Sequence, residues 1–140
     1  MKVVFLRHGE SEYNAKGLIN SDPSIKVHLT SKGKKQSKIA TEKLDSYNFD
    51  VILVSEFPRA KETAEIINEF FEAPIFTEKR ANEANVGFEG KTDQEFLDVA
   101  WKKSLFSYKL EGKESWHDLR KRVKEFLDSL KKERYKEVLV

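Results

Sequence analysis

The chain of 140 residues is long enough for one compact domain with its own hydrophobic core. Its hydrophobic share of 39% and charged share of 36% are typical of a globular chain and argue against a disordered one. A net charge of +2 is too small to indicate a nucleic-acid or membrane partner, and the absence of cysteine excludes disulfides and thiolate zinc sites. No stretch approaches the ~20 apolar residues of a membrane span, so we expect a cytoplasmic location.

The first predicted strand is the apolar run Val3-Val4-Phe5-Leu6. An uninterrupted run of branched and aromatic residues favours a strand buried on both faces, as in a parallel sheet. Arg7, His8 and Gly9 follow directly, at the carboxyl end of the strand, where open α/β sheets bind ligands. A guanidinium matches phosphate oxygens and an imidazole can attack phosphorus, so these residues form a candidate phosphate site. A surface histidine on an ordinary strand-to-loop turn is the alternative.

Residues 15–29 contain several turn-forming residues and predict a loop over the mouth of this site. Thr30 or Ser31 then caps a helix that ends near Leu44. Its inner face is predicted to consist of Ile39, Ala40 and Leu44. The lysine-rich run 32–38 is interpreted as a solvated helix face rather than a nucleic-acid patch, because no aromatic residues are interleaved with it.

Residues 50–54 are predicted to form a second buried strand, and Pro58 is predicted to begin the next helix. Arg59 therefore lies near a helix N-terminus at the carboxyl end of a strand, where the backbone N–H groups favour an anion. The apolar stripe of this helix comprises Ala60, Ala64, Ile67 and Phe71.

The second half of the chain continues the alternation of strands and helices. Residues 74–77 predict a short edge strand, and residues 80–90 predict a loop. Thr92 and Glu95 form a capping box at the start of the next helix. The apolar residues expected to pack this helix against the domain are Phe96, Val99, Ala100 and Leu105. Ser115 caps a last helix, and residues 137–140 begin a fourth buried strand. The stripe of the last helix comprises Trp116, Leu119, Val123, Phe126, Leu127 and Leu130.

Two segments together resemble the signatures of the histidine phosphatase superfamily, the phosphoglycerate mutase-like proteins. The first is Arg7-His8-Gly9-Glu10-Ser11 with Asn14. The second is residues 55–64, in which a serine precedes Arg59 and a Thr-Ala pair follows, although Glu56 stands where proline is usual. The resemblance implies an α/β fold, with a three-layer α/β/α arrangement and a mainly parallel doubly wound sheet, in a single domain over residues 1–140.

The same resemblance implies roles for individual residues. His8 would form a phosphohistidine, while Arg7, Asn14 and Arg59 would bind the phosphate. The loop at 80–90 resembles the family segment that supplies a catalytic carboxylate, which is Glu83 by position. A carboxylic acid can protonate the leaving alkoxide and then activate water, and without the resemblance Glu83 could equally be a solvated loop acid. The expected substrate is a small phosphorylated molecule, with no metal ion and no cofactor.

In proteins of this family a second His-Gly follows the strand that residues 137–140 begin. We therefore expect the chain to be truncated, leaving a central strand short and its neighbours without some ladder partners. The alternatives are that His28 or His117 fills the vacant role, or that the chain only binds phosphorylated ligands. Outside those roles, both histidines are interpreted as structural or surface residues.

A phosphatase is favoured over a phosphoglycerate mutase, because Val86 stands at the spacing of the tyrosine with which the mutases grip their substrate. The pattern Phe88-Glu89-Gly90 also resembles the phosphatases. A mutase, or a catalytically weak phosphate-binding relic, is the alternative. No nucleic-acid or membrane partner is expected, and the sequence leaves a homodimer open.

Overall fold

Four short parallel strands form one sheet in the computed structural model, which describes residues 1–104 and 107–140. They are β1 (Lys2–Val4), β2 (Val51–Val54), β3 (Ile75–Thr77) and β4 (Glu137–Leu139). The order across the sheet is β1-β4-β2-β3, with all three pairings parallel. Because the strands are parallel, their carboxyl ends lie at the same edge, where the motif after β1 meets the segment after β2.

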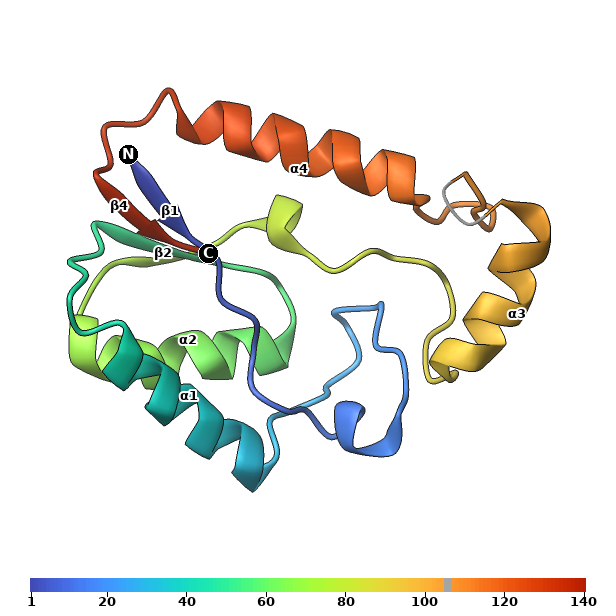
Figure 1. The fold of residues 1–140 in the computed structure, drawn as a ribbon, viewed down its shortest axis with the longest axis horizontal. Helices are drawn as coiled ribbons and strands as arrows, with labels where there is room; N and C mark the ends of the chain where they lie inside the picture. Colours follow the sequence, from blue (N-terminus) through green and yellow to red (C-terminus); the bar gives the residue numbers. More distant parts are fainter. Residues whose placement is uncertain (105–106) are drawn as a thin grey trace.

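Helices cover both faces of this sheet, as the predicted three-layer arrangement requires (Figure 1). Helices α1 (Ser31–Lys43) and α2 (Pro58–Phe71) lie on one face, and α4 (Trp116–Leu130) lies on the other. Helix α3 (Asp93–Lys103) lies apart from the sheet (Figure 1). Two single 3₁₀ turns are η1 (Asn14–Lys16) and η2 (Lys79–Ala81). Within the described ranges no helix is both long and apolar enough to cross a membrane.

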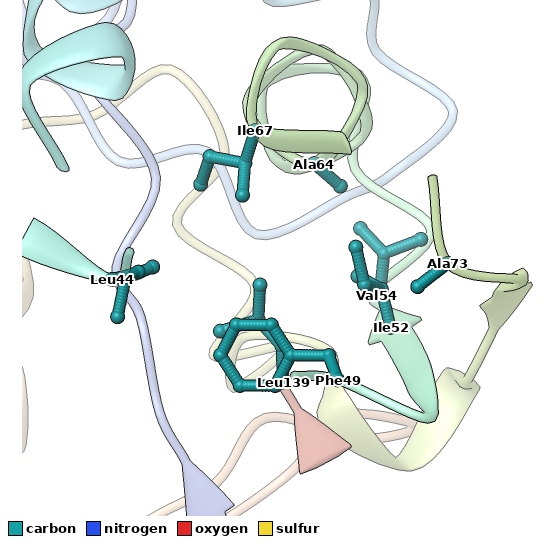
Figure 2. Close-up of a cluster of buried hydrophobic side chains, with 8 residues drawn as sticks. All are labelled: Leu44, Phe49, Ile52, Val54, Ala64, Ile67, Ala73 and Leu139. Atoms are coloured by element: carbon teal, nitrogen blue, oxygen red, sulfur yellow. The ribbon is translucent and has the colours of Figure 1, made fainter. Parts of the chain in front are cut away.

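The alternation of side chains along β2 divides the core between the two faces. Ile52 and Val54 point toward α2 and belong to the cluster that Figure 2 shows. That cluster comprises Leu44, Phe49, Ile52, Val54, Ala64, Ile67, Ala73 and Leu139. Val51 and Leu53 point the other way and pack with Val138 and with Phe126 and Leu130 of α4. Burial on both faces explains why residues 51–54 are all apolar.

The predicted helix starts are confirmed. Thr30 caps α1 by accepting a hydrogen bond from the Gly33 N–H, and Pro58 occupies the first turn of α2. Thr92 with Glu95, and Ser115 with Asp118, each form a complete capping box at the starts of α3 and α4. Leu105 lies outside the described residues.

Two expectations about burial are wrong. The strand β1 lies at the edge of the described sheet and is not buried on both faces; Phe5, just beyond it, is 60% exposed. Ile39 is 53% exposed, because α1 turns Gly33 and Ser37 inward instead. The strand β4 lies between β1 and β2, as expected of a central strand, and it is short: it pairs with Val51 and Ile52 of β2 but not with Leu53 and Val54.

A glycine-to-glycine contact joins α1 to the segment after β1. A Cβ atom added to Gly9 would lie 2.3 Å from the Gly33 carbonyl oxygen, and one added to Gly33 would lie 2.1 Å from the Glu10 carbonyl oxygen. The Thr30 N–H also donates to the Glu10 carbonyl at 2.9 Å. Only residues without a Cβ permit this approach of two backbones.

We expect Gly33→Ala to lower the free energy of unfolding by about 1–3 kcal/mol, because the added methyl group overlaps backbone that cannot rotate away. Urea denaturation measures the change. Lys35→Ala, on the exposed face of the same helix, serves as the control and should change the value by no more than about 0.5 kcal/mol. A Gly33→Ala variant as stable as the control would contradict the close contact.

Candidate active site

The imidazole of His8 lies at the carboxyl end of β1 with both ring nitrogens engaged. Its Nδ1 is 2.7 Å from the carbonyl oxygen of Gly9, and its Nε2 is 2.8 Å from Nε of Arg59. A carbonyl can only accept, so Nδ1 is the protonated nitrogen and donates to Gly9. Nε2 therefore has a free lone pair, which accepts from the guanidinium. The ring is held as one neutral tautomer.

The surroundings of His8 favour this neutral form. Burial lowers the pKa of its imidazole below the usual value, and the positive charges of Arg59 and Arg7 lower it further. The hydrogen bond to Gly9 and the negative charge of Glu83 act in the opposite direction without reversing the shift. At neutral pH the nitrogen that faces Arg59 is thus unprotonated, as a nucleophile must be.

Arg59 lies in the first turn of α2 and is only 5% exposed. Its guanidinium lies over the ring of Phe57, 4.2 Å from the ring centre. Its Nη1 donates to the side-chain oxygen of Asn20, and its Nη2 lies 3.4 Å from the Asn20 carbonyl. Burial lowers the pKa of Arg59, while Glu83 and Glu89 raise it; an arginine remains charged in any case.

Thr63 connects the two segments that contain His8 and Arg59. Its hydroxyl accepts from the Gly9 N–H at 3.2 Å and donates to the Arg59 carbonyl at 2.9 Å. One buried side chain of α2 thereby fixes the backbone on both sides of the His8–Arg59 contact.

The five residues predicted as site residues line one cavity of about 370 Å³. These are Arg7, His8, Asn14, Arg59 and Glu83. The side-chain oxygen of Asn14 accepts from the N–H and the hydroxyl of Ser11, each at 3.0 Å, which leaves the Asn14 amide N–H₂ group as the donor for an anion. The structure therefore brings together residues that are up to 76 positions apart, from Arg7 to Glu83.

A second cavity of about 590 Å³ shares four of these residues and extends along the sheet edge. Its shared lining is Arg7, His8, Arg59 and Glu83. The rest of its lining is mostly apolar and comes largely from the strand ends, α2 and α4, with Phe5, Val123 and Phe126 among the residues. The His8–Arg59 pair thus borders both cavities.

The other two histidines lie elsewhere. His28 is exposed and pairs through Nδ1 with Glu62 of α2, whose other oxygen accepts from the Leu29 N–H at 3.1 Å. His117 is exposed on α4. Neither is among the residues that line the two described cavities, so the structure does not favour the alternative in which one of them fills the role of a second histidine.

Glu89 and Asn20 belong to the site, although the sequence interpretation assigned them no role in phosphate binding. The Glu89 carboxylate accepts from the N–H groups of Ser21 and Asp22, at 2.6 and 2.8 Å, and from the Asn20 amide at 3.1 Å. These contacts hold the loop so that Asn20 meets Arg59. The family resemblance had pointed to the pair Glu89-Gly90. Its partner Asn20 lies 69 positions earlier in a turn, and nothing in the sequence around Asn20 indicates that it meets Glu89.

A second network holds the loop that bears Glu83. Arg122 of α4 forms a two-point ion pair with Glu114, at 2.8 and 2.7 Å, and donates to the carbonyls of Arg80 and Asn82 at 2.7 and 3.0 Å. Glu56 and Asn82 exchange two hydrogen bonds of 2.8 Å each. The glutamate that departs from the family pattern therefore braces the residue next to Glu83.

Comparison with known proteins agrees with this geometry. The sequence pattern of the histidine phosphatase superfamily, branch 1, matches residues 3–140. A 2,3-bisphosphoglycerate-dependent phosphoglycerate mutase of Thermoplasma acidophilum is 33% identical over 138 residues, covering 92% of this chain and 66% of the mutase. Phosphoserine phosphatase 1 of Hydrogenobacter thermophilus is 28% identical over 151 residues, covering 100% of this chain and 69% of that protein.

A solved structure extends the likeness to three dimensions. The α-ribazole phosphatase from Shigella flexneri superposes with a TM-score of 0.85 at 25% sequence identity, covering 99% of this chain and 72% of that one. The chain spans about two thirds of the length of the two curated relatives described above.

The charge environment of His8 gives a pH prediction. Because burial and two arginines lower its pKa, His8 should titrate below pH 6.5 in an NMR titration of the imidazole protons. Its folded-state pKa lies below the unfolded value, so its contribution to stability is present above pH 6.5 and is lost as the pH falls toward the folded pKa.

Arg7→Gln removes one of the two positive charges and should raise the pKa of His8. The matched control is Lys26→Gln, an exposed cation that lines neither cavity, which should leave the titration unchanged. A His8 curve that does not move in Arg7→Gln would show that Arg7 does not face the imidazole.

Proposed function

The chain belongs to the histidine phosphatase superfamily, and we propose that it hydrolyses phosphomonoesters of small metabolites through a phosphohistidine at His8. The observation that supports this most directly is the neutral His8, whose Nε2 lone pair faces a guanidinium 2.8 Å away in a cavity that Glu83 also lines. The proposal assigns these residues the roles of nucleophile, anion-binding group and proton donor, and it is supported by their lining of one cavity.

In the first step, the Nε2 lone pair of His8 forms a bond to phosphorus while the bond from phosphorus to the ester oxygen breaks. Glu83, as the carboxylic acid, gives its proton to the departing alkoxide. The proton on Nδ1 stays on the ring, and the Gly9 carbonyl stabilises the positive charge that the ring acquires. Arg7, Arg59 and Asn14 donate hydrogen bonds to the phosphoryl oxygens.

In the second step, the Glu83 carboxylate removes a proton from water, and the water oxygen attacks phosphorus. The bond between phosphorus and Nε2 breaks, the electron pair returns to His8, and inorganic phosphate leaves. Glu83 is again the acid and His8 is again neutral. Two arginines supply the positive charge that stabilises both transition states, so the scheme requires no metal ion.

A phosphoglycerate mutase is the second candidate, because the mutase of Thermoplasma is 33% identical to this chain. A mutase would use the same pair of residues but return the phosphoryl group to its substrate. Val86, which lines the 370 Å³ cavity, offers no hydroxyl at the spacing where the mutases have a tyrosine. Hydrolysis therefore remains the proposed reaction.

We expect His8→Ala to abolish the trapping of labelled phosphate on the protein, because no other histidine lines the described cavities. Incubation with a ³²P-labelled phosphomonoester, followed by quenching in alkali, measures the acid-labile label. The His117→Ala variant, an exposed histidine away from the site, should be labelled like the parent. Unchanged labelling of the His8→Ala variant would end the proposal.

Glu83→Gln should slow phosphate release from an alkyl phosphate by about 10²–10⁴-fold, because the alkoxide then leaves without a proton. With 4-nitrophenyl phosphate, the rate at which the bond from phosphorus to the ester oxygen breaks should fall much less, since nitrophenolate leaves without a proton. Burst kinetics separate that step from the later attack by water. Glu111→Gln, an exposed loop carboxylate outside the cavities, is the control. Equal losses with both esters at bond cleavage would contradict the role of proton donor.

A further inference from the structure

The cavity that holds the candidate phosphate site is also lined by apolar side chains. Of its lining residues, six present an aromatic ring or an aliphatic chain: Tyr13, Leu18, Ile19, Val86, Phe96 and Trp116. They line the same cavity as Arg7, His8 and Arg59, so they are the apolar groups available to the organic part of a phosphate ester bound there. An apolar wall beside a few convergent polar groups is typical of a small-molecule site.

Contacts behind this wall hold it in place without a ligand. The ring of Phe96 meets Phe88 edge to face, with 5.3 Å between the ring centres. Leu18 forms a backbone bridge with Thr92, and the Ile19 N–H donates to the Lys91 carbonyl at 2.7 Å. Trp116 is the first residue of α4, whose start is fixed by the capping box at Ser115.

The charges of the lining oppose an acidic substrate tail. Among the described residues that line this cavity, the only cations are Arg7 and Arg59, which the phosphate itself would occupy. The remaining charged residues are Glu83 and Asp93. Glu83 carries a proton when the ester binds in the proposed first step, so Asp93 is the negative charge that remains. A carboxylate on the organic part would lie in the same cavity as Asp93 without a cation of its own, which costs binding free energy. Asp93 accepts hydrogen bonds and so favours neutral or cationic groups.

We propose that this site selects phosphomonoesters whose organic part is apolar and contains a ring, and that it discriminates against phosphoacids. The inference rests on the proposed function, since it assumes that Arg7, His8 and Arg59 bind the phosphate. Phe96 and Trp116 contact the ring, and Asp93 repels a carboxylate.

Two non-hydrolysable probes of similar length test the selection: 3-phenylpropylphosphonate and 3-carboxypropylphosphonate. Isothermal titration calorimetry of the parent chain should give a dissociation constant about tenfold or more lower for the phenyl compound. Equal binding, tighter binding of the carboxylate, or binding of neither compound would overturn the inference.

Matched variants test which side chains cause the preference for the phenyl compound over the carboxylate compound. Trp116→Ala should reduce it to about threefold or less, because the ring loses an aromatic partner. Trp101→Ala removes an equally large side chain that is 74% exposed and lines neither of the two described cavities, and it should keep the preference. Asp93→Asn should strengthen binding of the carboxylate compound several-fold, whereas Asp98→Asn on the same helix should not. A preference that survives Trp116→Ala intact would overturn the placement of the ring.

Turnover distinguishes this inference from the proposed hydrolysis. Phosphate release is measured with 3-phenylpropyl phosphate and 3-phosphoglycerate, whose leaving groups are both alkoxides. A chain that prefers the phenyl phosphonate but releases phosphate from neither ester would support the selection and contradict the hydrolysis. A chain that releases phosphate faster from 3-phosphoglycerate would support the hydrolysis and overturn the selection.

Discussion

The arrangement of the site depends on one hydrogen bond, from Nε of Arg59 to Nε2 of His8. It joins the end of β1 to the first turn of α2 across 51 positions of sequence. Gly9 determines which ring nitrogen can accept a hydrogen bond, because its carbonyl oxygen accepts from the Nδ1–H group. Thr63 holds the backbone of both segments, and Asn20 holds the far side of the guanidinium. Together these contacts hold a neutral imidazole beside a buried cation.

The sheet and the helices position the residues that make this contact. Parallel strands place β1 and β2 so that the residues after each of them meet at one edge. The glycine contact lets α1 approach the backbone after His8, and Arg122 of α4 holds the carbonyls before Glu83 from the opposite face. Each side of the site is thus supported by a different layer of the fold.

Local signals predicted the helices well, since caps such as Thr30 and the box at Thr92 act within four residues. The buried strand β2 was also evident, but the apolar run at β1 was misread, because composition does not tell an edge strand from a central one. The site residues followed from the family resemblance rather than from periodicity. Asn20 and Gly33 were missed as site and contact residues, because their partners lie in distant segments that only the fold brings near.

The bond between Arg59 and His8 also limits what the ligand-free protein can react with. The lone pair needed for attack is covered by a guanidinium N–H, and only a stronger acceptor can draw that donor away. An anionic oxygen is such an acceptor, whereas a neutral electrophile is not. The resting imidazole is thereby shielded from uncharged alkylating or acylating compounds, and the negative charge of the incoming ester itself exposes the nitrogen that attacks it.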